Sequence, residues 1–479
     1  MKKNASHQGA LNDFFPFFYT FSTLPMLSLT QRLSGSLKLL DGASSLKVKA
    51  RITAVQGQGI DIVGLSGLVG VGASINLHAT HGQRIIAEIV GFSSGVCRAV
   101  AYHSVSGLSP GSCAVTALPP FPSGLAVHTS WLGRVIDPLG RPLDRCGPLI
   151  AGPEILPRYR EAPPSTTRAR LGPRIDLGVA AINLFATCRR GQRLGLFAGP
   201  GVGKSTLLGM LASNTKCDVV VIALIGERGR EVREFLEDEL KQSGLARAVV
   251  IVATSDMSSQ MRRESAVSAM TIAEYFRNIG KDVLLIMDSI TRYCLALREI
   301  GLAAGELPVS RGYPASVFSE LPRLLERAGP GPESDKTVGY ITGLFSVLIE
   351  GDDINDPLAD SIRGILDGHI VLDRKIAEGG RYPAIDVLRS LSRTVPGCNT
   401  NLENDIVSRA RGIISIYEDM HELIRLGAYR PGTDGTVDRA IELAPKIGKL
   451  LHQGKGIPIG IQEEFITLHG IIKNNQDEK

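Results

Sequence analysis

The sequence predicts an α/β chain whose core is a parallel β-sheet, with a small antiparallel β-barrel before it and a helical domain after it. Three observations indicate this fold class. Apolar runs alternate with helical patterns through the middle of the chain, as in βαβ units. Glycine-broken β-rich runs precede them, and apolar residues after residue 401 recur at helical spacing. A chain of 479 residues is expected to form about three domains.

The first 45 residues form an extension ahead of the predicted domains. Five phenylalanines crowd residues 11–29, and proline and aspartate interrupt the stretch, so a signal peptide is not expected. Because the aromatic content changes abruptly at Met26, we expect translation to start there and residues 1–25 to be an upstream artefact. Residues 27–40 predict a short amphipathic helix that contacts a membrane surface or a partner, or packs on its own domain.

Residues 46–117 predict the barrel. Its short β-rich runs (LKVKARITAV, GIDIV, QRIIAEIVGF and VCRAVAY) are separated by glycines and turn residues. The region contains two aromatic residues, Phe92 and Tyr102. Because barrels that bind single-stranded nucleic acid stack bases on aromatic side chains, no nucleic-acid partner is expected. The net charge of +5 is also too small for an obligate nucleic-acid binder.

Residues 118–400 predict the parallel-sheet domain, entered through a proline-rich link at residues 118–122. The near-continuous apolar character of its strands is typical of a sheet that is buried on both faces. We expect these strands at residues 194–197, 218–224, 248–253, 283–287, 338–349 and 369–372.

Residues 401–479 predict the helical domain. Apolar residues from Ile406 to Ile424 follow a repeating four-and-three spacing on one helix face. A second helix is expected at residues 437–451, broken near Pro445 because proline lacks the N–H that a helix interior needs. Residues 474–479 are expected to be a solvated tail.

The seven cysteines occur singly and form no CxxC pair. This pattern favours a reducing compartment and argues against structural zinc. No run of eighteen apolar residues occurs, so the sequence predicts no membrane-spanning helix.

The segment LGLFAGPGVGKST (residues 194–206) is the most informative, because an apolar strand runs into a glycine-rich turn that ends in Lys204 and Ser205. Such a turn lets backbone N–H groups converge on phosphate oxygens at a helix start. Lys204 is expected to reach the β- and γ-phosphates of ATP, and Ser205 to bind Mg²⁺. Ala198 stands where the strict pattern has glycine, and Pro200 cannot donate an N–H to phosphate. The residues expected to bind the nucleotide are Gly199, Gly201, Val202, Gly203, Lys204, Ser205 and Thr206.

Two further segments supply acidic side chains at the carboxyl edge of the predicted sheet, where ligands bind in open α/β folds. Asp288 ends the strand VLLIMD and is expected to hold Mg²⁺ through a water, or else to cap the next helix. In GERGREV (residues 226–232), Glu227 is expected to polarise the attacking water and Glu231 to join the metal's hydration shell. A solvated helix start is the alternative for both glutamates. Arg228 either contacts phosphate or forms an ion pair.

Four segments together carry a family resemblance that covers most of the chain from about residue 46. They are WLGRVIDPLGRPLD (131–144), GERGREV, the long segment from Asp288 to Gly329, and PAIDVLRSLSR (383–393). The chain resembles the ATPases of flagellar and virulence type III export, which are relatives of the rotary ATP synthase subunits. The resemblance implies a RecA-like core that hydrolyses ATP with Mg²⁺.

The resemblance also implies roles for residues that the sequence alone would not assign. Arg393 matches an arginine finger that reaches the nucleotide of a neighbouring subunit, so that the catalytic set becomes Lys204, Glu227, Arg228 and Arg393. Tyr382 matches an adenine-contacting position, and Tyr429 is a second candidate for the base pocket. Core packing is the alternative for both tyrosines.

One departure from the family pattern lies just ahead of the phosphate-binding turn. Where the family usually has Arg-Ala-Ile-Asp, this chain has Ala180, Ala181, Ile182 and Asn183. One charge of each sign is therefore lost, and the pairing that those charges make is absent or replaced here.

The resulting hypothesis is an ATP-hydrolysing ring subunit, a homohexamer, that energises flagellar protein export at the cytoplasmic face of the inner membrane. The implied partners are a regulator, a stalk-like protein, export chaperones and export substrates. The alternatives are a virulence export ATPase, a rotary synthase β-type subunit, a non-catalytic nucleotide-binding ring subunit and a Rho-like nucleic-acid translocase. A carboxylate at Glu227 disfavours the non-catalytic subunit, which usually has an amide there.

Overall fold

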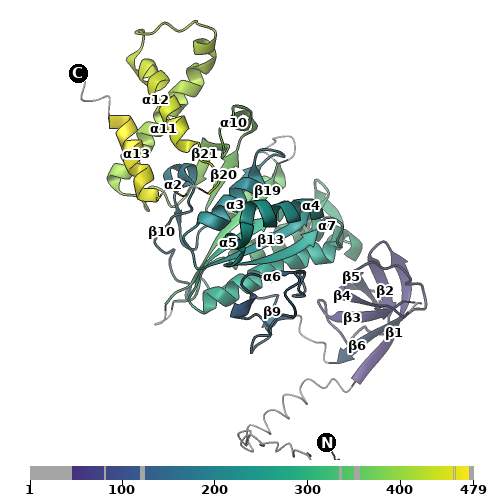
Figure 1. Ribbon diagram of the computed structural model, residues 1–479. Helices are drawn as coiled ribbons and strands as arrows, with labels where there is room; N and C mark the ends of the chain where they lie inside the picture. Colours follow the sequence, from purple (N-terminus) through teal and green to yellow (C-terminus); the bar gives the residue numbers. More distant parts are fainter. Residues whose placement is uncertain are drawn as a thin grey trace, which may run out of the picture.

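The computed structural model describes residues 46–79, 82–118, 124–333, 337–349, 356–456, 458 and 460–473. A β-barrel, a sheet flanked by helices and a helical C-terminal part follow one another along the chain, and the barrel and the C-terminal helices lie at opposite ends of the molecule (Figure 1). The predicted fold class is confirmed. The expected start at Met26, the helix at residues 27–40, most of the proline-rich link and the solvated tail lie outside the described residues.

Within the described residues, six antiparallel strands close the barrel in the order β1-β2-β5-β4-β3-β6. Alternate side chains point inward, and the interior is aliphatic, with Ile52, Ile60, Ile62 and Ile75 fully buried. The strands are β1 (Leu46–Gln56), β2 (Gly59–Val63), β3 (Ser74–His78), β4 (Arg84–Ser93), β5 (Val96–Ala101) and β6 (Cys113–Leu118).

The central sheet has nine strands among the described residues, in the order β21-β20-β12-β19-β15-β13-β14-β8, with β18 paired to β19 beside this path. All six predicted strands are present. The bounds are β8 (Val135–Ile136), β12 (Arg193–Ala198), β13 (Val219–Glu227), β14 (Ala248–Thr254), β15 (Asp282–Asp288), β18 (Gly329–Pro330), β19 (Tyr340–Leu348), β20 (Gly368–Leu372) and β21 (Ile385–Ser392).

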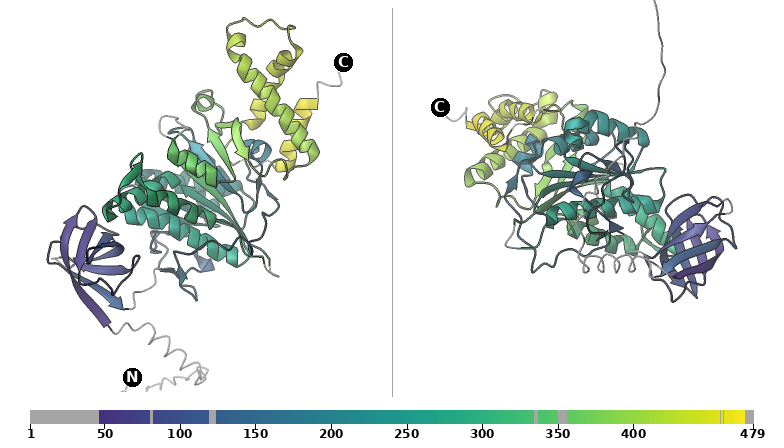
Figure 2. Two further views of the ribbon diagram at one scale, coloured as in Figure 1. Left: turned by 180° about the vertical axis from the view of Figure 1, so that it is seen from behind. Right: turned by 60° about the horizontal axis from the view of Figure 1, so that its bottom comes forward.

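Both faces of the sheet are covered by helices (Figure 2). Along β13, Val220 and Ile222 pack into one core with α3 (Lys204–Asn214), whereas Val219 and Val221 pack into the other core with α6 (Ser259–Asn278) and α7 (Ile290–Ala304). Because successive residues of a strand face opposite sides, burial of both faces requires apolar residues at every position. This explains the continuous apolar runs in the sequence.

Two strands run against the parallel direction, β18 beside β19 and β21 beside β20. The sequence analysis did not predict these antiparallel strands. Ser392, the last residue of β21, pairs with Gly368, the first residue of β20. The chain beyond β21 therefore returns to the amino ends of the parallel strands, the edge opposite the phosphate-binding turn.

The C-terminal part contains α11 (Asn401–Arg425), α12 (Gly435–Leu451) and α13 (Ile461–Lys473). Thr400 and Glu403 form a capping box that begins α11. The predicted break near Pro445 is wrong, because α12 continues through it. Pro445 is exposed, so water can bond the carbonyl that it leaves unpaired, while Leu443 and Ile447 beside it are buried. The sequence analysis did not predict α13.

Shorter elements connect these parts, and none of the described helices is long and apolar enough to cross a membrane. The connecting elements are β7 (Gly124–Leu125), η1 (Thr129–Trp131), β9 (Leu156–Pro157), β10 (Arg174–Ile175), α2 (Ala180–Phe185), β11 (Cys188–Arg189), α4 (Gly229–Glu234), the π-helical turn η2 (Phe235–Leu240), α5 (Lys241–Leu245), β16 (Pro308–Ser310), β17 (Tyr313–Pro314), α8 (Ala315–Glu326), α9 (Pro357–Ile365) and α10 (Arg374–Glu378).

Candidate functional site

The glycine-rich turn joins β12 to α3, so it lies at the carboxyl edge of the sheet. Gly201 and Gly203 have φ angles of 76° and 87°, in the left-handed region that glycine adopts without strain. Gly203 is the N-cap of α3 and provides no side chain to cap the first N–H groups. Those donors and the positive end of the helix dipole are therefore available to an anion.

Lys204 begins α3 and brings the turn into contact with the acidic residues of the neighbouring strands. Its Nζ donates to Oδ1 of Asp288 at 2.5 Å and lies 3.7 Å from Oε1 of Glu227. Asp288 ends β15, is 4% exposed and also accepts a hydrogen bond from the Ser346 hydroxyl at 2.6 Å. The cap of α7 is Ser289, which accepts from Arg292 N, so the alternative of Asp288 as helix cap is wrong.

Glu227 ends β13 beside a bulge at Gly226, whose φ of 71° turns the strand. Burial raises the pKa of Glu227 and the nearby Asp288 adds to this, whereas Lys204 and Arg292 lower it. Arg292 Nε lies 3.6 Å from Oε1 of Glu227, and a Cβ on Gly226 would come within 2.6 Å of the Arg292 side chain. Glycine at position 226 thus lets Arg292 reach the carboxylate.

Arg228 and Glu231 lie at the start of α4, next to Glu227. They form an ion pair at 3.5 Å, with side chains 76% and 38% exposed. Glu231 also raises the pKa of Glu227. The structure therefore brings Glu231 to the cluster, whereas the guanidinium of Arg228 lies in solvent with Glu231 as its partner.

Tyr382 lies against the glycine-rich turn. A Cβ on Gly203 would stand 3.3 Å from two ring carbons of Tyr382, and the tyrosine is 41% exposed. Its backbone is bonded to the segment after α12, where the Tyr382 carbonyl accepts from Gln453 N at 2.8 Å. An exposed ring beside the phosphate-binding turn is suitably placed to contact a base.

Tyr429 lies elsewhere, and its prediction as a base-pocket residue is wrong for this chain. Its hydroxyl bonds to Asp434 and Asp438 at the far end of α12. The segment that bonds Tyr382 follows the other end of that 17-residue helix, about 25 Å away at 1.5 Å per residue. Tyr429 therefore fastens the turn between α11 and α12.

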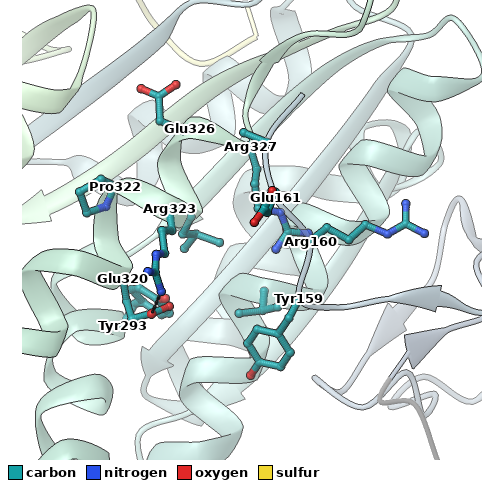
Figure 3. Close-up of a pocket in the computed structure, with 12 residues that line it drawn as sticks. Tyr159, Arg160, Glu161, Tyr293, Glu320, Pro322, Arg323, Glu326 and Arg327 are labelled. Carbon is teal, nitrogen blue, oxygen red and sulfur yellow. Dashed lines mark hydrogen bonds and ion pairs between the residues drawn. The ribbon is translucent and has the colours of Figure 1, made fainter. Parts of the chain in front are cut away.

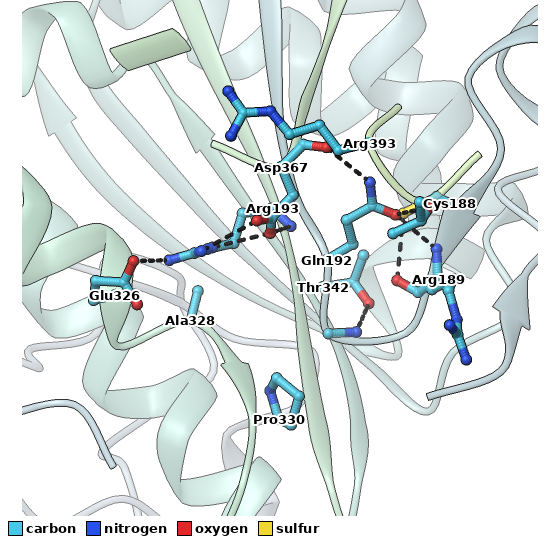
Figure 4. Close-up of polar contacts among 12 residues, drawn as sticks. Cys188, Arg189, Gln192, Arg193, Glu326, Ala328, Pro330, Thr342, Asp367 and Arg393 are labelled. Atoms are coloured by element: carbon cyan, nitrogen blue, oxygen red, sulfur yellow. Dashed lines mark hydrogen bonds and ion pairs between the residues drawn. The ribbon is translucent and has the colours of Figure 1, made fainter. Parts of the chain in front are cut away.

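Arg393 follows β21 at the opposite edge of the sheet. It lies near Asp367 (Figure 4). Its N–H donates to the Asp367 carbonyl, and the Asp367 carboxylate pairs with Arg193 at 3.1 Å. Arg193 begins β12, which spans six residues before the phosphate-binding turn, a length of about 16 Å. The structure therefore does not bring Arg393 to Lys204 of the same chain.

The cluster at the carboxyl edge fits a magnesium nucleotide. Ser205 is exposed on the first turn of α3, Asp288 lies beside Lys204, and a buried oxygen of Glu227 has no hydrogen-bond partner. In the described residues, no group of three His, Cys, Asp or Glu side chains is arranged to hold a metal. Mg²⁺ takes one or two protein ligands and completes its shell with phosphate and water, so the Ser205 hydroxyl and the Asp288 carboxylate are suitable donors for it.

A cavity of about 750 Å³ lies away from this cluster, between the segment around Tyr159 and helices α7 and α8 (Figure 3). Tyr293, Arg323 and Arg327 are among its lining residues. None of the site residues predicted from the sequence lines it.

Sequence reasoning missed three residues near the site. Arg292 and Ser346 contact Glu227 and Asp288, and Thr206 donates to Glu239 at 3.1 Å. The signal for Arg292 was its position four residues after Asp288, in the first turn of α7. Ser346 and Glu239 lie in ordinary strand and helix patterns that carry no such signal.

Comparisons with known proteins agree with this geometry. The ATP synthase alpha/beta family nucleotide-binding domain matches residues 178–392, and the C-terminal domain of the type III secretion ATPase EscN matches residues 401–469. Flagellum-specific ATP synthases are 48% identical in Caulobacter vibrioides, over 90% of this chain and 97% of the relative, and 41% identical in Bacillus subtilis, over 93% and 100%.

The chain belongs to the flagellar and type III secretion export ATPases. The solved structure of the assembled ATPase EscN from enteropathogenic E. coli matches with a TM-score of 0.82 at 39% identity, covering 88% of this chain and all of EscN. As a member of this family, the chain is an ATP hydrolase of type III export. The predicted family and enzyme class are confirmed.

Proposed function

We propose that this chain is the ATPase ring subunit of a flagellar export apparatus and that each active site is built by two chains. The observation that carries the proposal is that the charged residues of the predicted site lie at two opposite edges of the sheet. Lys204, Glu227 and Asp288 meet at the carboxyl edge, while Arg393 lies at the amino edge, beyond a strand about 16 Å long. An arginine there is out of reach of the site on its own chain, which supports a role at the site of a neighbouring chain.

In this proposal the chain binds the nucleotide with the residues that the sequence indicated. Backbone N–H groups of residues 199 to 206, apart from Pro200, hold the phosphates together with Lys204. Ser205 binds Mg²⁺, and Asp288 and Glu231 orient its water ligands. When bound, Mg²⁺ neutralises charge on the β- and γ-phosphates.

Glu227 orients and polarises the attacking water in this proposal. Its carboxylate is largely buried, and burial raises its pKa, which makes it a better proton acceptor than a solvated carboxylate. Lys204 and Arg292 limit that rise and fix the carboxylate in position. Arg228 assists from the edge of the site as a phosphate contact, and Tyr382 stacks on the adenine.

Arg393 is proposed as the arginine finger, which stabilises charge in the transition state of the neighbouring site. The ring is proposed to be a homohexamer with a central stalk. Support comes from two solved structures of EscN, one of the assembled ATPase and one of EscN with its central stalk EscO. This chain is 38% identical to the EscN chain of the second structure, over 88% of its own length.

The flagellar branch is favoured by identity, since a curated flagellum-specific relative is 48% identical over 90% of this chain. Solved virulence-type ATPases are 39% identical over 88% of the chain and 44% identical over 73% of it. We further propose that the protein works at the cytoplasmic face of the inner membrane, in peripheral contact with it. A regulator, export chaperones and export substrates are its proposed partners, and nucleic acid is not.

Steady-state ATPase assays on assembled protein test the composite site. Arg393→Ala is expected to lower turnover by about 10³ or more while leaving nucleotide binding intact. Lys204→Ala is expected to lower both. An Arg393→Ala protein with wild-type turnover, or a wild-type protein that stays monomeric at every concentration and still turns over at full rate, would contradict the proposal.

A further inference from the structure

The first turn of α3 is tied to the C-terminal part of the chain through one glutamate. The Thr206 hydroxyl donates to Oε1 of Glu239 at 3.1 Å, and Nζ of Lys455 donates to the same oxygen at 2.7 Å. Thr206 is two residues beyond the phosphate-binding lysine, Glu239 belongs to η2, and Lys455 follows α12. A contact thus runs from the phosphate-binding turn to the C-terminal helices.

Close packing fixes Glu239 in this position. A Cβ on Gly209 of α3 would come within 2.7 Å of Cβ of Glu239, so η2 and α3 touch where the glutamate side chain begins. The Glu239 side chain is only 14% exposed. Its carboxylate therefore has little freedom, and any shift of η2 acts on α3. Single π-helical turns inside helices occur frequently at functional sites.

The segment that contains Lys455 also contacts residues on the other side of the phosphate-binding turn. Its neighbour Gln453 donates through its backbone N–H to the Tyr382 carbonyl and through its side chain to the Gly178 carbonyl, and its amide oxygen accepts from Ala180 N at 3.1 Å. Tyr382 lies against Gly203. Residues 453–455 therefore contact the base side of the turn through Tyr382 and the helix side through Glu239.

We propose that Glu239 is a positioning residue that couples the segment 453–455, and with it the C-terminal helices, to the first turn of α3. The inference rests on the proposed nucleotide-binding function and adds a route by which movement of the C-terminal helices alters the grip on phosphate. Glu239 acts through Thr206 and α3 and does not touch the nucleotide.

The test is the dissociation constant of a fluorescent ADP analogue for the full-length protein. Lys455→Met and Glu239→Gln are each expected to weaken binding about two- to fivefold, the range for one partly exposed ion pair. Because both changes remove the same pair, the double variant is expected to bind as weakly as either single variant. Lys455→Arg keeps the charge and is expected to restore the wild-type constant.

Lys446→Met is the matched control. Lys446 pairs with Glu442 at the same 2.7 Å and is 50% exposed, as Lys455 is, but its partner lies one turn earlier on the same helix, α12. It is expected to leave the dissociation constant unchanged. Thr206→Val keeps the backbone N–H and the β-branched shape, and it is expected to reproduce the loss seen in Lys455→Met.

The outcomes are distinguishable. If Lys455→Met binds like Lys446→Met, or if the effects of Lys455→Met and Glu239→Gln add, the coupling is wrong while the proposed function stands. If the wild-type protein itself fails to bind the analogue, the proposed function is wrong. Melting temperatures without nucleotide identify a variant that is merely unstable, since its melting temperature would fall. In that case Lys455→Arg is not expected to keep the wild-type constant.

Discussion

At the scale of single residues, burial and neighbouring charges determine the position and the pKa of the side chains in the site. Lys204, Asp288 and Glu227 were predicted from the sequence because a glycine-rich turn and apolar strand ends mark the carboxyl edge of a sheet. Arg292 and Glu239 were not, since the contact of Arg292 with the end of β13 and the contact of Glu239 with α3 depend on how the elements pack together. Tyr429 was predicted wrongly because the sequence does not show which end of α12 lies beside the phosphate-binding turn.

Glu227→Gln is expected to lower the turnover number by about 10²–10³, because the amide cannot accept the proton of the attacking water. Nucleotide binding is expected to survive, since Lys204 keeps Asp288 as a partner. The measurement is kcat beside the dissociation constant of a fluorescent nucleotide. The control Glu231→Gln, at a half-exposed side chain, is expected to have the smaller effect, and the reverse order would contradict the assigned roles.

Glu464 makes stability depend on pH. It is fully buried at the start of α13, and burial raises its pKa to about 7, against a smaller lowering by Asn183, while Asp176 adds to the rise and Lys216 opposes it. The folded protein therefore holds a proton that the unfolded chain releases near pH 4.5. Stability from this group is complete below that pH and is lost as the pH rises to about 7, by about 3 kcal/mol.

Glu464→Gln should remove this dependence. The free energy of unfolding of the wild-type protein, measured by urea titration from pH 5 to pH 8, is expected to fall more steeply with pH than that of the variant.

The same buried surroundings bear on Asn183, which stands where the family usually has aspartate. The Asn183 amide donates to Asp176 at 2.8 Å. Asn183→Asp would add a third carboxyl group and is expected to destabilise the wild-type protein more than the Glu464→Gln variant. Parallel pH profiles for the wild type and Glu464→Gln would show that Glu464 titrates normally.

At the scale of elements, the strands were predictable and their directions were not. Continuous apolar runs mark β12, β13, β14, β15 and β19, because a doubly covered sheet buries every position. The antiparallel direction of β21 depends on its pairing with β20. The sequence pattern of a strand is the same in parallel and antiparallel sheets, so it does not predict this direction. The predicted break at Pro445 failed because buried neighbours on α12 outweigh the missing hydrogen bond.

Pro445→Ala is expected to strengthen α12. Alanine restores an N–H at an exposed position, and the gain is about 1–2 kcal/mol once the added freedom of the unfolded chain is subtracted. Hydrogen exchange of the amides in residues 446–451 is expected to slow accordingly. Pro445→Gly provides the control, with a smaller gain because glycine favours the helix less. Faster exchange in the alanine variant would mean that the proline itself stabilises the helix.

At the scale of the whole molecule, a buried ionic network joins the barrel to the sheet domain. Arg263 of α6 bonds to Glu88 of the barrel at 2.5 Å and to Glu264 at 2.7 Å, and Arg158 reaches Glu264 from the preceding segment. Burial alone would raise the pKa of Glu264, but the two arginines outweigh it and lower that pKa. No sequence pattern marks this junction, since Glu88, Arg158 and the adjacent pair Arg263 and Glu264 lie far apart along the chain.

Arg263→Met is expected to destabilise the protein by about 3–5 kcal/mol, because it leaves two buried carboxylates without their shared partner. Chemical denaturation measures the loss, and hydrogen exchange in the barrel should rise first. The neighbouring Arg262→Met serves as the control: its partner Glu299 is 45% exposed, so the expected cost is below about 1 kcal/mol. Equal costs for the two variants would contradict a special role for the buried network.

Because β21 is antiparallel to β20, it places Arg393 away from Lys204 of the same chain. The proposed shared site then has a consequence for rings that are assembled from two different variants. A chain with Lys204→Ala still offers its Arg393, and a chain with Arg393→Ala still offers an intact pocket. Two preparations that are each inactive should therefore rescue one another when they are mixed and reassembled, with on the order of a quarter of the contacts between adjacent copies competent at an equal ratio. Mutual rescue of this kind is not available to an enzyme whose lysine and arginine meet within one polypeptide.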